Sequence, residues 1–97
     1  MHDGRRVTNT VTLERPGDFC WAWSMEGAIA AICFLCPTCG ANHAVGVKPG
    51  DPSGWEWNGD LDKPTLSPSL SFAYGHPKSN PDCRWHGFLK DGEWHDA

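Results

Sequence analysis

The sequence has no long hydrophobic run. Its longest apolar stretch, residues 28–36, is far shorter than the ~20 residues that a membrane-spanning helix needs. No apolar segment of the kind found in secretory signals follows the first residues, and Arg5-Arg6 lacks the apolar stretch of a twin-arginine signal. We therefore expect a cytoplasmic protein that does not associate with membranes.

Basic residues are also scarce. Eight Lys and Arg stand against twelve Asp and Glu, which gives a formal net charge of −4, and the longest basic run is Arg5-Arg6. Proteins that bind nucleic-acid backbones need clustered positive charge. The composition therefore argues against a nucleic-acid partner.

The chain is short, which limits its core. Its 97 residues allow one domain, predicted to span residues 1–97. A domain of this size buries a marginal core and usually adds a disulfide, a metal or a partner subunit. Five Cys in a protein expected in a reducing compartment favour a metal over disulfides.

The pattern along the chain predicts short strands rather than helices. Eleven Gly and eight Pro argue against long helices. Residues 24–35 fit either a helix or a strand, and the Pro that follows Cys36 favours a strand. Asn58-Gly59-Asp60 is typical of a tight hairpin. The other predicted strands cover residues 7–14, 19–23, 43–47, 55–57 and 70–74, with a terminal hairpin over residues 88–95.

Two short turns share one spacing of metal-ligating residues. Residues 36–40 read Cys-Pro-Thr-Cys-Gly, and residues 83–87 read Cys-Arg-Trp-His-Gly. Two residues between ligands let both ligands reach one tetrahedral ion, and thiolates and imidazoles are the ligands of structural zinc. The sequence therefore predicts a small, mostly-β single domain that is zinc-ribbon-like, with two zinc knuckles joined by short antiparallel strands. The predicted ligands of the structural Zn²⁺ are Cys36, Cys39, Cys83 and His86.

Other interpretations of the cysteines stay open. Buried thiols without a metal would leave the repeated spacing unexplained. Cys33, Cys36 and Cys39 have a spacing found in iron–sulfur proteins, but Cys33 and Cys36 would point to opposite faces of a strand. A catalytic zinc usually keeps an open position, whereas four ligands fill the tetrahedron here. Cys20 and Cys33 are expected in the core.

No nucleophile, base and acid stand out as a catalytic set in the sequence. The Ser and Thr side chains of residues 64–71 can line a polar site, but we expect them to bond to their own backbone. Six Trp are present, more than the core of so small a domain can enclose. Exposed indoles favour a protein-contact surface, for which Trp55, Trp57 and Trp85 are the candidates.

Three segments together carry a family resemblance. They are C-P-x-C-G at residues 36–40, W-x-W-N-G-D-L-x-x-P-T-x-S-P-S at residues 55–69, and C-x-W-H-G-F-L-x-D-G-x-W at residues 83–94. In this order they resemble a family of unknown function that is common in bacteriophages and prophages and is sometimes labelled "ammonia monooxygenase". The resemblance covers about residues 33–95. It implies a phage origin and the same zinc ligands, but no established activity, and no copper or di-iron ligand set supports that label.

The function expected from these features is that of a noncatalytic, zinc-binding phage accessory protein. It would act through contact with a host or phage protein, with inhibition of a host or defence factor as its role. The alternatives are a virion structural or assembly factor, a small enzyme that uses the zinc or residues 64–69, and a nucleic-acid-binding zinc ribbon.

Overall fold

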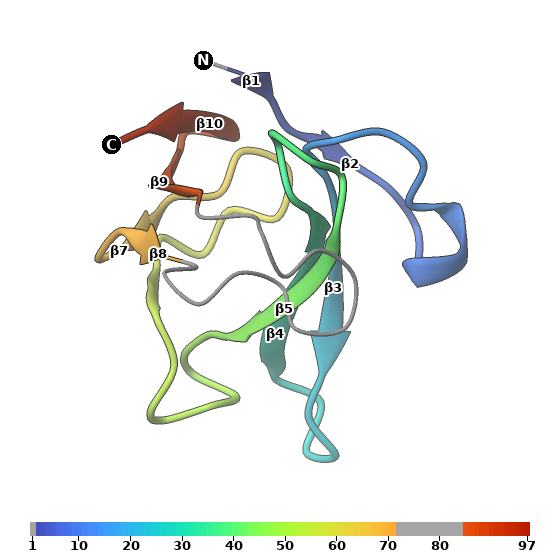
Figure 1. The fold of residues 1–97 in the computed structure, drawn as a ribbon. Helices are drawn as coiled ribbons and strands as arrows, with labels where there is room; N and C mark the ends of the chain where they lie inside the picture. Colours follow the sequence, from blue (N-terminus) through green and yellow to red (C-terminus); the bar gives the residue numbers. More distant parts are fainter. Residues whose placement is uncertain (1, 72–84) are drawn as a thin grey trace.

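The fold is built from short strands and one turn of helix. The computed structural model describes residues 2–71 and 85–97 (Figure 1). The elements in chain order are β1 (His2–Asp3), β2 (Arg5–Arg6), η1 (Thr10–Thr12), β3 (Asp18–Trp23), β4 (Ile29–Leu35), β5 (Asn42–Gly46), β6 (Glu56–Trp57), β7 (Leu66–Ser67), β8 (Leu70–Ser71), β9 (His86–Lys90) and β10 (Glu93–Asp96). Within the described ranges, no helix is long and apolar enough to cross a membrane.

Two four-stranded sheets hold most of these strands. One sheet has the order β1-β10-β9-β8, the other has the order β2-β3-β4-β5, and β6 pairs with β7 separately. The neighbours in these sheets are antiparallel, apart from β2 and β3, which are parallel. Because β1 and β2 follow each other along the chain, the N-terminal segment runs along the edges of both sheets.

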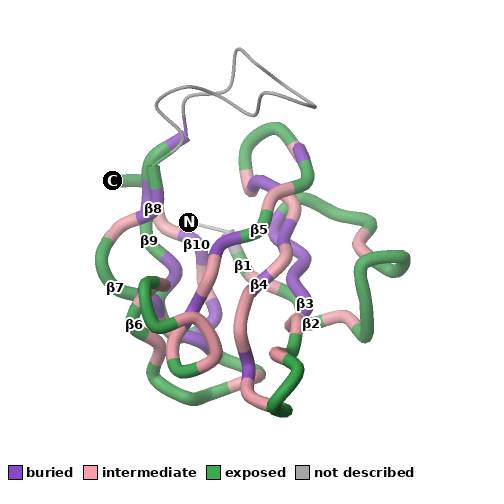
Figure 2. Tube along the Cα trace, turned by 90° about the horizontal axis from the view of Figure 1, so that it is seen from below, coloured by how far each residue is buried: buried purple, intermediate pink, exposed green. Residues whose placement is uncertain are grey.

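Aromatic side chains connect the two sheets through the core. Phe34 of β4 and Trp94 of β10 are both buried, and their rings lie 4.8 Å apart. The indole N–H of Trp94 donates to the carbonyl oxygen of Gly17 at 2.9 Å, so its one polar group is satisfied. Figure 2 shows buried residues on the strands of both sheets and exposed residues on many of the connecting segments. The core therefore includes the region where β4 and β10 meet.

The small, mostly-β single domain predicted from the sequence is confirmed. Residues 19–23 lie in β3, residues 43–46 lie in β5, and the C-terminal hairpin forms between β9 and β10. The ambiguous residues 24–35 form a turn followed by β4. Asp91 and Gly92 both have positive φ values, 50° and 78°, as the tight turn of the C-terminal hairpin requires.

The strand predicted over residues 7–14 is wrong. Asn9 caps the helical turn η1, because its side chain accepts from the N–H of Val11 at 3.0 Å and the Thr12 hydroxyl donates to its carbonyl at 2.8 Å. Val11, which lies within the predicted strand, is 88% exposed. Local capping therefore overrides the β-branched alternation of this segment.

The tight hairpin predicted at residues 58–60 is also wrong. Strands β6 and β7 do pair, but residues 58–65 connect them in a longer loop. The side-chain oxygen of Asn58 accepts from the N–H groups of Asp60 and Thr65 at 3.1 Å, and the Asp60 carboxylate accepts from the N–H groups of Asp62 and Lys63 at 2.9 Å. These side chains stabilise the longer loop.

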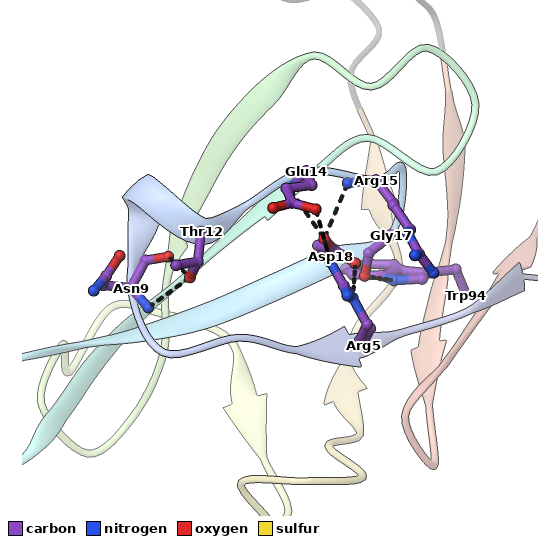
Figure 3. Close-up of polar contacts among 8 residues, drawn as sticks. All are labelled: Arg5, Asn9, Thr12, Glu14, Arg15, Gly17, Asp18 and Trp94. Carbon is purple, nitrogen blue, oxygen red and sulfur yellow. Dashed lines mark hydrogen bonds and ion pairs between the residues drawn. The ribbon is translucent and has the colours of Figure 1, made fainter.

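A buried carboxylate ties the N-terminal segment to the second sheet (Figure 3). Asp18, at the start of β3, accepts from Arg5 Nε at 2.9 Å and from Arg5 Nη2 at 2.6 Å. It also accepts from the backbone N–H groups of Glu14 and Arg15, each at 3.0 Å. Asp18 is 1% exposed, but these four donors satisfy the charge of its carboxylate.

Candidate active site

Strand β9 presents alternate residues to solvent and to the core. His86, Phe88 and Lys90 are exposed, whereas Gly87 and Leu89 are buried. This alternation follows from the pleat of a strand that has one face on the core. The exposed face of β9 therefore carries an imidazole next to an apolar ring, and Phe88 is 43% exposed.

Pairing with β8 brings a serine to the imidazole. The register places Leu70 opposite Gly87 and Ser71 opposite His86. Ser69, two residues before Ser71, is the diagonal neighbour of His86, and diagonal neighbours on one face of a sheet can touch. The Oγ atom of Ser69 lies 2.8 Å from Nε2 of His86, which is a hydrogen-bond distance.

The backbone of His86 is held on both sides. Trp85 is buried, donates from its indole N–H to Asp96 Oδ1 at 2.9 Å, and packs edge-on against Trp94 with ring centroids 5.8 Å apart. The N–H of Ala97 donates to the carbonyl oxygen of His86 at 2.9 Å. The imidazole is therefore exposed, but it stands on a well-packed strand.

Gly87 is required where β9 crosses the buried indole. A Cβ atom at this position would overlap the carbonyl oxygen of His95 and the ring of Trp85. We expect Gly87→Ala to lower the free energy of unfolding by about 1–3 kcal/mol, the usual cost of overpacking. Chemical denaturation would measure this loss, and an unchanged midpoint would contradict the close packing described here.

A serine hydroxyl and an imidazole at this distance can act together in acyl transfer. In the tautomer that carries its proton on Nδ1, Nε2 of His86 accepts the hydroxyl proton of Ser69. A serine hydroxyl is a weak nucleophile until a neighbouring base takes its proton. Ser69 is half-buried and His86 is exposed, so a substrate can reach the pair from the exposed face of β9.

Three of the four predicted zinc ligands lie among the described residues, Cys36 and Cys39 at the turn after β4 and His86 on β9. Cys36 is buried and Cys39 is exposed, in a turn where the N–H of Gly40 donates to the carbonyl of Cys36 at 2.8 Å. Cys83 lies outside the described residues, and His86 bonds to Ser69. Within residues 2–71 and 85–97, no three His, Cys, Asp or Glu side chains gather as a metal site. The zinc-ribbon part of the fold prediction is therefore not confirmed, and the four-ligand site stays a prediction.

The other described cysteines and most of the tryptophans are buried or partly buried. Cys20 is buried as expected, whereas Cys33, its cross-strand partner on β4, is half-buried. Of the three candidate contact tryptophans, Trp85 is buried, and Trp55 and Trp57 are partly buried against the core. A partner surface at these three residues stays a prediction. Among the described tryptophans, the largest exposed fraction, 61%, belongs to Trp23.

Sequence reasoning included Ser69 only within residues 64–69, the segment named for an alternative enzyme, and gave His86 a different role. A serine beside a proline in a loop is common, and nothing local marks it as a nucleophile. The available signal was that Ser69 ends one of the three segments that carry the family resemblance and that His86 lies in another. Two segments that carry one family resemblance can supply two parts of one site.

Comparison with known proteins identifies a family. Residues 6–97 match the family model described as "Bacterial ubiquitination-like system serine protease (BubE)". No curated protein and no solved structure matches the chain. The match extends beyond the resemblance over residues 33–95, and its description names neither zinc nor a bacteriophage.

This match corrects the function expected from the sequence. The chain was expected to be a noncatalytic, zinc-binding phage accessory protein that acts through protein contact, which is wrong because the matched family is one of serine proteases. The description of the chain as a phage zinc ribbon is corrected with it to that of a protease family of a bacterial ubiquitination-like system. The described residues form no metal-ligating group of three or more side chains, and a site that includes Cys83 stays a prediction.

Proposed function

The chain belongs to the BubE family, the serine proteases of bacterial ubiquitination-like systems, and on this premise we propose that Ser69 is its nucleophile and His86 its general base. The observation that supports this assignment is the 2.8 Å contact between Ser69 Oγ and His86 Nε2. A nucleophile within hydrogen-bond reach of its base is the first geometric requirement of covalent catalysis.

The reaction follows from these two groups. Ser69 Oγ attacks the carbonyl carbon of the scissile bond while His86 Nε2 takes the hydroxyl proton. The same nitrogen then gives this proton to the leaving amine, so that an acyl-enzyme and a free amine form. Water, deprotonated by His86, attacks the acyl carbon and releases Ser69 and the carboxylic acid.

The contact also separates Ser69 from its neighbouring serines. Ser67 and Ser71 are more exposed than Ser69, and Ser71 lies directly opposite His86 in the β8–β9 register. The hydroxyl within 2.8 Å of the imidazole is nevertheless that of Ser69. Ser67→Ala and Ser71→Ala are therefore matched controls for Ser69→Ala.

The substrate is a protein of a ubiquitination-like system. In this proposal, the protein partner expected from the sequence is the substrate, which approaches the exposed face of β9. Phe88, exposed on the same face two residues after His86, offers an apolar surface beside the scissile bond. The cytoplasmic location stays a prediction.

A fluorophosphonate probe tests this proposal directly. Such a probe forms an Oγ–P bond with an activated serine and releases fluoride. We expect one adduct per chain, located at Ser69 by peptide mass spectrometry, absent in Ser69→Ala and retained in Ser67→Ala and Ser71→Ala. Labelling that persists in Ser69→Ala, or that maps to another serine, would contradict the assignment.

A further inference from the structure

Trp55 lies beside the segment that carries Ser69, and its backbone is fixed by β5 and the residues that follow it. The N–H of Trp55 donates to the carbonyl of Gly46 at 2.8 Å, and the carbonyl of Trp55 accepts from the N–H of Lys48 at 3.0 Å. Val47, which forms a bridge with Trp55, is fully buried. The indole therefore extends from an anchored backbone.

The indole N–H reaches the backbone on both sides of the Ser69 Cα atom. Trp55 Nε1 lies 3.0 Å from the carbonyl oxygen of Pro68 and 3.3 Å from that of Ser69. Pro68 and Ser69 lie between β7 and β8, outside both strands. One donor thus holds the carbonyl groups that precede and follow the Cα atom of Ser69 at the point where the chain leaves one sheet for the other.

We propose that Trp55 is a positioning residue that sets the Ser69 hydroxyl at its distance from His86. This inference rests on the proposed function of Ser69. The two carbonyl groups define the peptide planes that flank Ser69, so holding them restricts the direction of its Cα–Cβ bond. Without the indole donor, the segment between β7 and β8 gains freedom and the Oγ–Nε2 contact is populated less often. Trp55 touches neither the substrate nor the imidazole in this role.

Trp57 supplies a matched control. It lies two residues after Trp55, is also partly buried against the core, and donates from its indole N–H to the carbonyl oxygen of Asp60 at 3.0 Å. Trp57→Phe therefore removes a similar hydrogen bond from a loop that does not carry Ser69. A purely structural role of Trp55 would make the two Phe variants alike.

The experiment compares Trp55→Phe and Trp57→Phe with the unmodified protein. The measurements are the rate of fluorophosphonate labelling at Ser69, kcat and KM for p-nitrophenyl acetate, and the midpoint of thermal unfolding. We expect Trp55→Phe to slow labelling and to lower kcat about tenfold with little change in KM, since small misplacements of a reacting group cost up to about 10²-fold. Trp57→Phe should have an unfolding midpoint similar to that of Trp55→Phe, and its Ser69 should be labelled at the rate of the unmodified protein.

A second replacement separates the hydrogen bond from the packing of the ring. The amino acid 3-benzothienylalanine at position 55 keeps a bicyclic ring and replaces the N–H group by sulfur. We expect it to slow labelling as Trp55→Phe does, even if the Phe variant folds poorly. Labelling at the unmodified rate with this residue, or an equal slowing by Trp57→Phe, overturns the inference and leaves Ser69 as the nucleophile. No adduct at Ser69 of the unmodified protein overturns both proposals.

Discussion

Ser69→Ala is expected to lower kcat for peptide hydrolysis by at least about 10³-fold while leaving the fold unchanged, because removing the nucleophile of a serine protease removes the covalent pathway. The Ser69 hydroxyl makes its side-chain hydrogen bond to an exposed imidazole, so its loss leaves no buried polar group unpaired. The measurements are steady-state kinetics and the midpoint of thermal unfolding on the same preparations. A variant that keeps a tenth of the activity would contradict the role of Ser69.

The matching change at the base decides between two roles for His86. As general base, His86→Ala lowers kcat by a similar factor, and the double variant with Ser69→Ala is no worse than either single variant, because the two groups act as a unit. Its unfolding midpoint should stay near that of the unmodified protein. As a structural zinc ligand, His86 would instead be needed for folding, and its replacement would lower the midpoint and release metal. The comparison variant is Cys36→Ser, which changes another predicted zinc ligand at a position far along the chain from Ser69. Its unfolding midpoint and its activity are compared with those of His86→Ala.

Much of the fold could be predicted because its signals are local. In β3 and the β9–β10 hairpin, the hydrophobic pattern and the turn residues agree with the final structure. For β4 the pattern also allowed a helix, and the proline after Cys36 favoured the strand that forms. The failures occur where short side chains bond to nearby backbone. Asn9 begins a helical turn within an alternating pattern, and Asn58 and Asp60 stabilise a longer loop where a tight hairpin was expected.

The candidate site could be predicted only in part because its geometry is not local. His86 stood out as a residue able to carry chemistry, but the same imidazole suits zinc and proton transfer equally well. Its partner depends on the register between β8 and β9, which the residues of neither strand specify alone. Ser69 is brought to His86 by this pairing, and the proposed role of the imidazole rests on that contact.

Asp18→Asn is expected to lower the free energy of unfolding by about 2–4 kcal/mol, the range for breaking one side of a buried, hydrogen-bonded ion pair when its partner keeps access to water. The side chain of Asp18 is 2% exposed and that of Arg5 is 44% exposed. Oδ2 accepts from Arg5 Nη2 and from both backbone N–H groups, whereas Oδ1 accepts from Arg5 Nε. With an amide oxygen at the Oδ2 position, the amide NH2 group faces the Arg5 Nε donor, so that hydrogen bond is lost together with the negative charge. Urea denaturation at neutral pH would measure the loss.

An exposed ion pair in the same segment gives the control. Arg6 Nη1 and Asp62 Oδ1 lie 3.0 Å apart, with side chains 41% and 78% exposed. We expect Asp62→Asn to cost less than about 1 kcal/mol, because solvent screens exposed pairs. Equal losses in the two variants would show that the burial of Asp18 adds nothing to its contribution.

The pH dependence of stability should identify the same carboxylate. Hydrogen bonds from Arg5, followed by those from the backbone N–H groups of Arg15 and Glu14, hold the pKa of Asp18 well below its usual range, against the effect of burial. In the unfolded chain this pKa returns to about 3.9. Folding therefore favours the ionised carboxylate. The stability that the ionised Asp18 contributes is fully present above about pH 4 and is lost as the pH falls further towards the folded-state pKa.

The pKa of the exposed Asp60 is also lowered, by backbone hydrogen bonds, but Asp60 titrates both in the unmodified protein and in Asp18→Asn, so the comparison cancels its effect. The difference in unfolding free energy between the unmodified protein and Asp18→Asn should therefore shrink as the pH falls from 5 to 2, and a constant difference would contradict the ion pair as its source.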